Sequence, residues 1–365
     1  MAAYLGNILI IILCRLSRIR LTAGGREVSR KKAECVIFSF LWIILSGFRS
    51  LSVGADTMAY GNDFERITAA SWSTLWNNLV RKMSGIQSML AENPLNKDPG
   101  FKLLTKAMSL VFPTYRLYLI AVAVLFMTLL GRFLYRNAKD PFPGFILFDC
   151  LFYSFYAITG IRQTIATALI VLWGYDYIRE RKPVPFFLIS FLAFTIHKSA
   201  LCFVPFYFIS RIRVNRIFIA ATVPAITASF VFRERIMDIL SRLMGYEQYN
   251  QQYGDSGPVV FTLLLAAVFL FCSIFRKRLA ENAPDFQSKY MALTLALFFV
   301  PLAFIDPSAM RVSYYYALFL MVLLPDIMDI FPDKIRTLLT MGITAAMVLF
   351  LISNQPSYTF FFLEG

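Results

Sequence analysis

LYLIAVAVLFMTLLGRFLYRNAK, residues 117–139, is the kind of stretch that decides the fold of this chain. It opens with a nearly unbroken apolar run and ends with Arg132, Arg136 and Lys139. A helix of roughly 20 apolar residues crosses the hydrocarbon core of a bilayer, and Lys and Arg collect in cytoplasmic loops beside such helices. We therefore predict a transmembrane helix over residues 116–131 whose basic end faces the cytoplasm.

The composition of the whole chain supports the same interpretation. Hydrophobic residues make up 58% of the 365 positions and charged residues only 16%, which is more apolar surface than one soluble core can bury. Lipid is therefore the expected solvent. We predict an all-α fold, a polytopic transmembrane helix bundle that forms a single integral membrane domain over residues 1–365.

Hydropathy along the chain predicts about twelve membrane spans. Several are shorter than the roughly 20 residues of a perpendicular helix, so tilted, kinked or re-entrant pieces are expected near 2–14 and 184–210. The predicted spans are 2–14, 34–47, 116–131, 143–159, 161–178, 184–197, 199–210, 216–232, 258–275, 290–305, 311–328 and 335–353.

The distribution of Lys and Arg assigns a side to each loop between these spans. One side receives 22 of the 36 basic residues in short loops with 11 of the 22 acidic ones, and the other side holds the remainder in longer loops. Because cytoplasmic loops carry the excess of Lys and Arg, we place the first side in the cytoplasm and both termini outside. Topology also explains the net charge of +14, so we expect no nucleic-acid partner.

The two longest connections, 48–115 and 233–257, fall on the outer, extracytoplasmic side. Each contains apolar residues at helical three- and four-residue steps, which predicts an amphipathic helix at the membrane interface. The alternative is a small water-soluble subdomain. The recurring residues are Trp72, Leu75, Trp76, Leu79, Met83, Ile86 and Leu90 in the first loop and Ile236, Ile239, Leu240 and Leu243 in the second.

Residue types that hold metals or cofactors are sparse. The chain has one His, and its five Cys are isolated in or beside apolar stretches without metal-ligand spacing. No P-loop, GxGxxG or HExxH motif occurs. We therefore expect no metal and no cofactor, and any phosphate must be bound by other means.

Two polar motifs lie where predicted spans meet the outer side. The first, RSLSVGADTMAYGNDF over residues 49–64, brings together Arg49, Asp56, Thr57 and Tyr60. Carboxylates bind hydroxyls or protons, Arg binds phosphate bidentately and Tyr offers a stacking face, although a capped turn would also explain the pattern. The second, TGIRQTIATAL over 159–169, places Arg162 and Gln163 at a helix start, where an anion is attracted unless Arg162 only reaches lipid headgroups.

Two more motifs share this side. FTIHKSAL, residues 194–201, sets His197 and Lys198 at a predicted helix break, where ionisable groups are costly and broken helices line cavities. FIDPSAMRVSYYYALF, residues 304–319, places Arg311 and Tyr315 on one helical face. A structural His and an interfacial aromatic belt are the plainer alternatives.

The shared sidedness of these residues argues for a common site. Independent membrane anchors would be expected at both faces, whereas Arg49, Asp56, Arg162, His197 and Arg311 all fall on the outer one. Three guanidinium groups without a metal cluster indicate a bound diphosphate.

The same motifs resemble the EpsG family of Wzy-type polymerases, which join lipid-linked repeats into exopolysaccharide or O-antigen. The matching blocks run from Arg49 to Phe64, Gly160 to Leu169, His197 to Leu201 and Arg311 to Tyr315, with a weaker match at the DPGF block that starts at Asp98. The resemblance implies a metal-independent glycosyltransferase in the bacterial cytoplasmic (inner) membrane, acting on undecaprenyl-diphosphate sugars at its outer, periplasmic face. A lipid-linked donor and acceptor, membrane lipids, a chain-length regulator and a flippase would be its partners.

On this interpretation Arg49, Arg162 and Arg311 stabilise the departing diphosphate. Either His197 or Asp56 accepts the proton of the attacking hydroxyl, with His197 slightly favoured. The remaining substrate-binding residues would be Thr57, Tyr60, Gln163, Lys198 and Tyr315. Two alternative functions use the same lipid, a flippase or transporter and an O-antigen ligase, and a non-enzymatic scaffold is the third.

Overall fold

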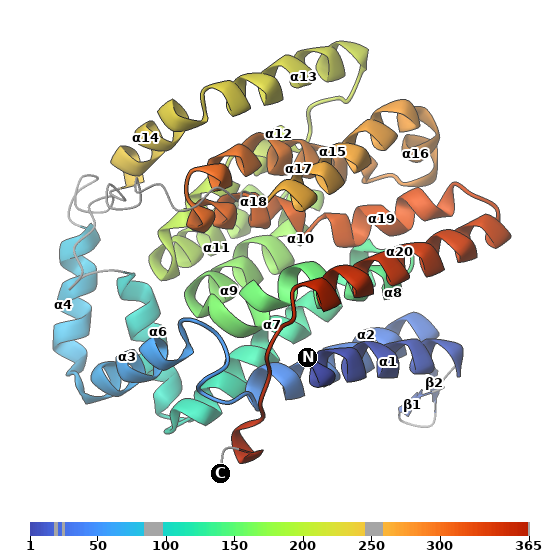
Figure 1. The fold of residues 1–365 in the computed structure, drawn as a ribbon. Coiled ribbons are helices and arrows are strands. Elements are labelled where there is room, and N and C mark those ends of the chain that lie inside the picture. The colour runs from blue at the N-terminus through green and yellow to red at the C-terminus, as the bar shows by residue number, and fades with distance from the viewer. Residues whose placement is uncertain (18–20, 24–25, 84–97, 245–257, 364–365) are drawn as a thin grey trace.

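The computed structural model describes residues 1–17, 21–23, 26–83, 98–244 and 258–363 (Figure 1). Almost every element in these ranges is a helix, as the sequence predicts. The all-α class is confirmed, and the exception in these ranges is a pair of three-residue strands, β1 (Leu21–Ala23) and β2 (Arg26–Val28), which pair antiparallel.

Fewer helices qualify as membrane spans than the predicted twelve. Within the described ranges three are long and apolar enough: α7 (Tyr115–Asn137), α17 with its 3-10 extension η7 (together Phe286–Phe304) and α20 (Asp333–Ser353). Three bent pairs raise the number to six if each pair is one span. They are α13 (Arg216–Val231) with α14 (Arg233–Met244), α15 (Val259–Ile274) with α16 (Arg276–Asn282), and α18 (Met310–Ala317) with α19 (Leu320–Asp329).

The other predicted spans correspond to helices that are shorter, interrupted or, in α2, charged in the first turns, so a membrane bundle of twelve full spans is not confirmed. The helices in question are α1 (Ala2–Leu16), α2 (Arg30–Gly47), α8 (Phe142–Leu147), α9 (Ile161–Thr167), α10 (Gly174–Arg179), α11 (Pro183–Ile196) and α12 (Phe206–Ile209). Between them lie the π-helical segments η2 (Phe148–Phe152), η3 (Ser154–Thr159) and η4 (Ala168–Trp173) and the 3-10 segment η5 (Lys198–Phe203).

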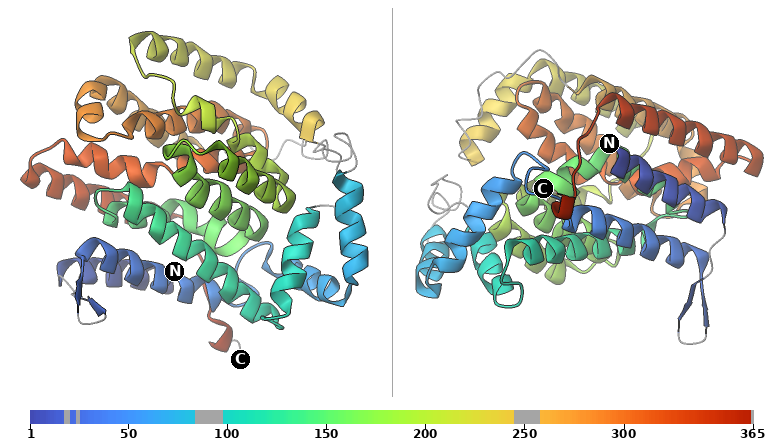
Figure 2. Two further views of the ribbon diagram at one scale, coloured as in Figure 1. Left: turned by 180° about the vertical axis from the view of Figure 1, so that it is seen from behind. Right: turned by 60° about the horizontal axis from the view of Figure 1, so that its bottom comes forward.

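The connections between helices gather at two opposite ends of the bundle (Figures 1 and 2). One, which we call the loop end, is formed by α3 (Thr57–Ala69), α4 (Trp72–Met83), α6 (Pro99–Ser109) and α14. The other, the basic end, is formed by β1, β2, α16 and the connection from α19 to α20. The loops with many Lys and Arg in the sequence therefore lie together, away from the two long connections.

Helices α4 and α14 fall within the two long connections for which amphipathic helices are predicted. In α4, Leu75 is buried whereas Trp72 and Trp76 are exposed, so the helix presents apolar side chains both inward and outward. The parts of the two predicted outer loops over 84–97 and 245–257 lie outside the described residues.

Aromatic rings fill the centre of the bundle. Phe319 contacts Phe133 and Tyr175 edge-on, and Phe203 and Phe206 pack against the same ring. All five side chains are fully buried or nearly so. Edge-to-face aromatic pairs add about 0.5–1.5 kcal/mol beyond their buried area, so this cluster holds α7, α10, η5 and α18–α19 together below the loop end.

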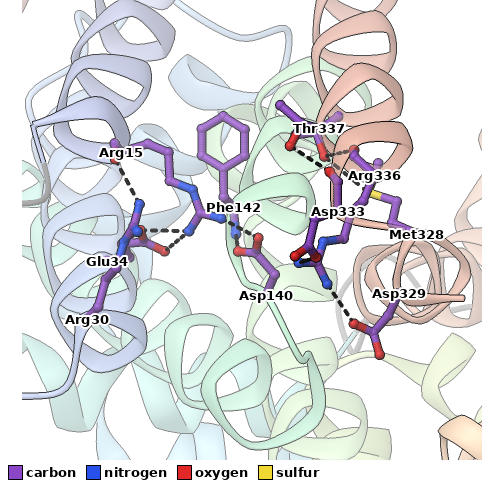
Figure 3. A network of polar contacts seen from close by, with 11 residues as sticks. Arg15, Arg30, Glu34, Asp140, Phe142, Met328, Asp329, Asp333, Arg336 and Thr337 are labelled. Atoms are coloured by element: carbon purple, nitrogen blue, oxygen red, sulfur yellow. Dashed lines mark hydrogen bonds and ion pairs between the residues drawn. The ribbon is translucent and has the colours of Figure 1, made fainter. Parts of the chain in front are cut away.

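Ion pairs hold the basic end together (Figure 3). Arg15 of α1 contacts Glu34 of α2 at 2.9 Å and Asp140 at 2.5 Å, and Arg336 of α20 contacts Asp329 of α19 at 3.0 Å. Deeper in the bundle, Lys289 of α17 lies 2.7 Å from Asp326 of α19, and both side chains are 1% exposed. These three cations therefore each have a carboxylate partner from another helix.

Two helix breaks occur at the loop end and place the site. Gly160 separates η3 from α9, and His197 separates α11 from η5. Broken helices in membrane proteins are tolerated where they line a cavity or are covered by protein, and single π-helical turns like those in η2–η4 concentrate near functional sites.

Candidate functional site

A polar cavity of about 180 Å³ lies at the loop end, beside both helix breaks. Its lining comes from α3, the η3–α9 break, the α11–η5 break and α18, elements that are far apart in the sequence. The residues that line it are Asp56, Ala59, Tyr60, Asp63, Phe155, Gly160, Arg162, Gln163, His197 and Arg311.

Helix α3 supplies the acidic side of the cavity. Asp56, Tyr60 and Asp63 are spaced by four and three residues, so they share one face of the helix. The turn before α3 requires Gly54, which has a φ of +96° and no room for a side chain, because an added Cβ would lie 2.7 Å from Ile158 Cγ2. Thr57 is buried and is not among the residues that line the cavity, and its hydroxyl donates to the carbonyl of Val53 at 2.7 Å.

Arg162, in the first turn of α9, lines the cavity with its side chain. Its Nη1 donates to Oδ2 of Asp98 at 2.8 Å, and its Nε donates to the Tyr60 hydroxyl at 3.2 Å. The guanidinium also lies 5.6 Å from the centre of the Tyr60 ring, within cation–π range. Arg162 is thus held by two residues of the long first connection while it still faces the cavity.

His197 is the residue at which α11 ends. It is 4% exposed, and its Nδ1 lies 3.6 Å from Asp98 Oδ2. That separation is longer than a hydrogen bond, and Nδ1 has no hydrogen-bond partner among the described residues. The imidazole therefore lies close to a carboxylate without being locked to it.

Arg311 approaches the cavity from α18. Its guanidinium lies 5.8 Å from the centre of the Phe155 ring, and it makes no hydrogen bond or ion pair with any residue in the described part of the chain. Gln163 joins α9 to α18, because its Nε2 donates to the carbonyl of Arg311 at 2.7 Å. Arg311 is therefore a cation at a polar cavity without a carboxylate partner in the described residues.

Three further predicted residues are buried beside the cavity or away from it. Lys198 and Tyr315 are buried, and the Tyr315 hydroxyl bonds to Ser199 at 3.0 Å. Arg49 lines a different and much smaller cavity of about 10 Å³. It is buried, Nη1 donates to the Ser46 carbonyl, and its backbone pairs with Phe360 near the C-terminus. The expected group of three arginines is therefore a group of two here.

Asp98 is the residue that sequence reasoning did not place in the site. It caps α6, is 5% exposed, and its Oδ2 faces both Arg162 and His197. The only sequence signal was the DPGF block, because Asp followed by Pro and Gly marks a turn and helix start. Nothing in the sequence shows that this turn lies against the α11–η5 break.

One more cation lies close to this group of charges. Burial lowers the pKa of Lys102 on α6, whereas the nearby carboxylates of Asp63 and Asp98 raise it. The charged groups at and beside the cavity thus include Arg162, Arg311 and Lys102 together with the carboxylates of Asp56, Asp63 and Asp98. No group of three or more His, Cys, Asp or Glu is arranged to hold a metal ion in the residues that the structure describes.

Comparison with known proteins gives one match. The sequence model of the EpsG family matches residues 32–362, nearly the whole chain. No curated protein and no solved structure matches. The match includes every residue that lines the cavity.

Proposed function

We propose a function for this chain on the premise that it belongs to the EpsG family, a family of Wzy-like polymerases. The family and the apolar helices make it a membrane protein of the polysaccharide-polymerase type. Our proposal is that it transfers a growing glycan from undecaprenyl diphosphate to a lipid-linked oligosaccharide repeat, in O-antigen or exopolysaccharide synthesis.

The reaction breaks one bond and forms one. A hydroxyl oxygen of the non-reducing sugar of the acceptor attacks the anomeric carbon of the donor glycan. The bond from that carbon to the diphosphate oxygen breaks, and undecaprenyl diphosphate leaves with the electron pair. The proton of the hydroxyl passes to a base of the protein. Charge develops on the departing diphosphate, so cations placed beside it lower the barrier most.

The observation that carries this proposal is the pair Arg162 and Arg311 at one polar cavity, beside the chain's single His. Arg311 lacks a carboxylate partner among the described residues, and an anion with several oxygens would satisfy it. Arg guanidinium groups bind phosphate oxygens bidentately. We assign both to the diphosphate, and we assign Arg49, which lies at the separate small cavity, to structural support.

Two residues at the cavity could accept the proton, His197 and Asp56. We favour His197, because neutral imidazole is an effective base near neutral pH. Asp56 and Tyr60, which line the acidic side, would then bind sugar hydroxyls, and Gln163 would hold α9 and α18 at a fixed separation. Lys198 and Tyr315 are buried, and we assign them to the packing around the helix break at His197.

The deciding experiment measures chain length in a polymerase-null strain that expresses variants of this protein. We expect Arg162→Ala and His197→Ala to give single repeats on the lipid A core or on the carrier, while wild type gives long chains. Long chains from both variants would remove the catalytic assignment. If the protein were a ligase, the inactive variants would leave the lipid A core uncapped. If it were a flippase, they would leave repeats on the inner leaflet.

A separate labelling experiment tests the proposed orientation, in which the loop end faces the periplasm. In a variant without the five native cysteines, Arg66→Cys on α3 and Lys277→Cys on α16 place one exposed thiol at each end. An impermeant thiol reagent added to intact spheroplasts should label the first and not the second. The reverse result would place the cavity on the cytoplasmic side.

A further inference from the structure

One carboxylate oxygen lies between the two groups to which the proposed function gives chemical roles. Oδ2 of Asp98 is 2.8 Å from Nη1 of Arg162 and 3.6 Å from Nδ1 of His197. The Asp98 side chain is only 3% exposed. A buried carboxylate is expensive unless it is paired, and one partner, Arg162, would be enough for pairing.

The backbone conformation around Asp98 positions this carboxylate oxygen. Asp98 has a φ of +48°, in the left-handed region, which Asp tolerates better than most non-glycine residues. Pro99 then starts α6. Gly100 lies so close to the end of α11 that an added Cβ would be 2.2 Å from Thr195 Oγ1 and 2.8 Å from the Thr195 carbonyl carbon. The turn is thus pressed against the last residues before His197.

The charges around His197 indicate what the Asp98 carboxylate could do, which is to balance a protonated imidazole. When His197 accepts a proton, the new imidazolium lies near two other cations, Arg162 and Arg311. The acidic residues that line the cavity are Asp56 and Asp63 on α3, but among the described carboxylates it is the Asp98 oxygen that lies within 4 Å of the imidazole. A carboxylate beside Nδ1 also favours the tautomer with the proton on Nδ1, leaving the Nε2 lone pair available.

We propose that Asp98 is a positioning residue of the transfer reaction that acts through His197 and Arg162. It holds Arg162 in place for the diphosphate, orients the imidazole with Nδ1–H toward the carboxylate, and balances the imidazolium after Nε2 has taken the hydroxyl proton. Asp98 itself stays ionised throughout. The step closes the 3.6 Å contact to hydrogen-bond length, an approach of roughly half an ångström that rotation of the imidazole supplies.

This inference rests on the proposed function and is tested with purified full-length protein in lipid nanodiscs. The rate of chain extension and the binding of undecaprenyl diphosphate are measured for wild type and for Asp98→Asn, whose amide oxygen still accepts from Arg162. We expect kcat to fall by about 100-fold or more, while binding of the lipid diphosphate changes by less than about threefold, because both arginines remain. A residue with only a structural role would lose both properties together.

A double-mutant cycle tests whether Asp98 acts through His197. Asp98→Asn in the His197→Ala background should cost little more than His197→Ala alone, since residues that act as one unit are non-additive. Two independent losses that multiply would overturn the proposal. Asp333→Asn, a carboxylate change at the exposed basic end, is the matched control and should leave kcat within about twofold.

The outcomes separate this proposal from the function on which it rests. If wild type extends no lipid-linked repeat and binds no lipid diphosphate, the proposed function itself is wrong. If wild type is active and Asp98→Asn keeps its kcat, only the role of Asp98 is wrong. Should Asp98→Asn not give monodisperse protein, Asp98→Glu keeps the charge and misplaces the oxygen. It should retain the binding of lipid diphosphate and lower kcat by about tenfold or more, and an unchanged kcat would overturn the proposal.

Discussion

The two ends of the bundle differ in how the cations that we describe are paired with carboxylates. At the basic end Arg15 and Arg336 each contact a carboxylate from another helix (Figure 3), and Lys289 does so deeper in the bundle. At the loop end Arg162 shares one carboxylate oxygen with His197, and Arg311 makes no ion pair with any described residue. These three cations at the basic end are neutralised by carboxylates of the protein, whereas Arg311 at the loop end is available to an anion.

This difference separates structural charges from functional ones better than the sequence motifs do. Ionisable groups at membrane depth are costly, so they persist where they are paired or where they serve a function. A paired group such as Lys289 is explained by its partners alone. A cation such as Arg311, without an ion pair among the described residues, is not explained by the protein's own charges.

The largest expected effect is on stability at the basic end. Lys289→Ala would leave Asp326 buried without its 2.7 Å partner, and removing one member of a buried pair costs about 3–5 kcal/mol. We expect a large drop in the thermal unfolding midpoint of the detergent-solubilised protein, with unchanged activity per folded molecule. The double variant Lys289→Met/Asp326→Leu should recover most of the loss. If the single variant unfolds like wild type, the charges at this end do not hold it together.

The second effect is on activity at the loop end. Arg311→Ala removes a cation that makes no ion pair with any described residue, so the fold should lose little, and the unfolding midpoint should stay close to that of wild type. Chain extension should fall by about 10²–10³-fold, the usual cost of removing one donor that stabilises developing negative charge. Arg311→Lys should restore only part of the rate, because an ammonium cannot bind phosphate bidentately. A full rate from Arg311→Ala would break the contrast between the two ends.

The third effect tests how tightly the loop end is built. Gly100→Ala forces a Cβ against Thr195, and such overpacking costs about 1–3 kcal/mol. Since Asp98 caps the start of α6, the rate of chain extension per folded molecule should fall as well, because the carboxylate is displaced. Gly342→Ala on α20 is the matched control, because nothing lies within 4 Å of the added Cβ, and it should be neutral or slightly stabilising. Equal behaviour of the two variants would mean that the Asp98 turn is loosely held.

Features that depend on local sequence could be predicted for this molecule. Apolar runs give helices, and the density of Lys and Arg in each loop sorts the loops into two sets, which the structure gathers at opposite ends. The motifs around Asp56, Arg162, His197 and Arg311 fall in one set, and their side chains line one cavity. The prediction of a common location needed no knowledge of which helix packs against which.

Features that depend on packing could not be predicted. Arg49 follows a predicted span just as the other site residues do, but the C-terminal residues around Phe360 cover it, more than 300 positions away in the sequence. Asp98 reaches His197 only because α6 packs against α11. The count of twelve spans is not confirmed, because six of the predicted spans fall on helices that are short, charged or interrupted by π-helical and 3-10 turns, which hydropathy along the sequence does not reveal.

The smallest expected effect sharpens the comparison within the basic end itself. The Arg336 side chain is 42% exposed, and its partners Asp329 and Asp333 are 30% and 88% exposed. Exposed ion pairs contribute about 0–1 kcal/mol and are screened by salt, so Arg336→Ala should shift the unfolding midpoint slightly, and less at about 0.5 M salt than at low salt. Lys289→Ala, by contrast, should keep its full effect at both ionic strengths because water and ions do not reach the pair. A salt-independent loss in Arg336→Ala as large as that in Lys289→Ala would show that the basic end depends on the exposed network of Figure 3 rather than on the buried pair.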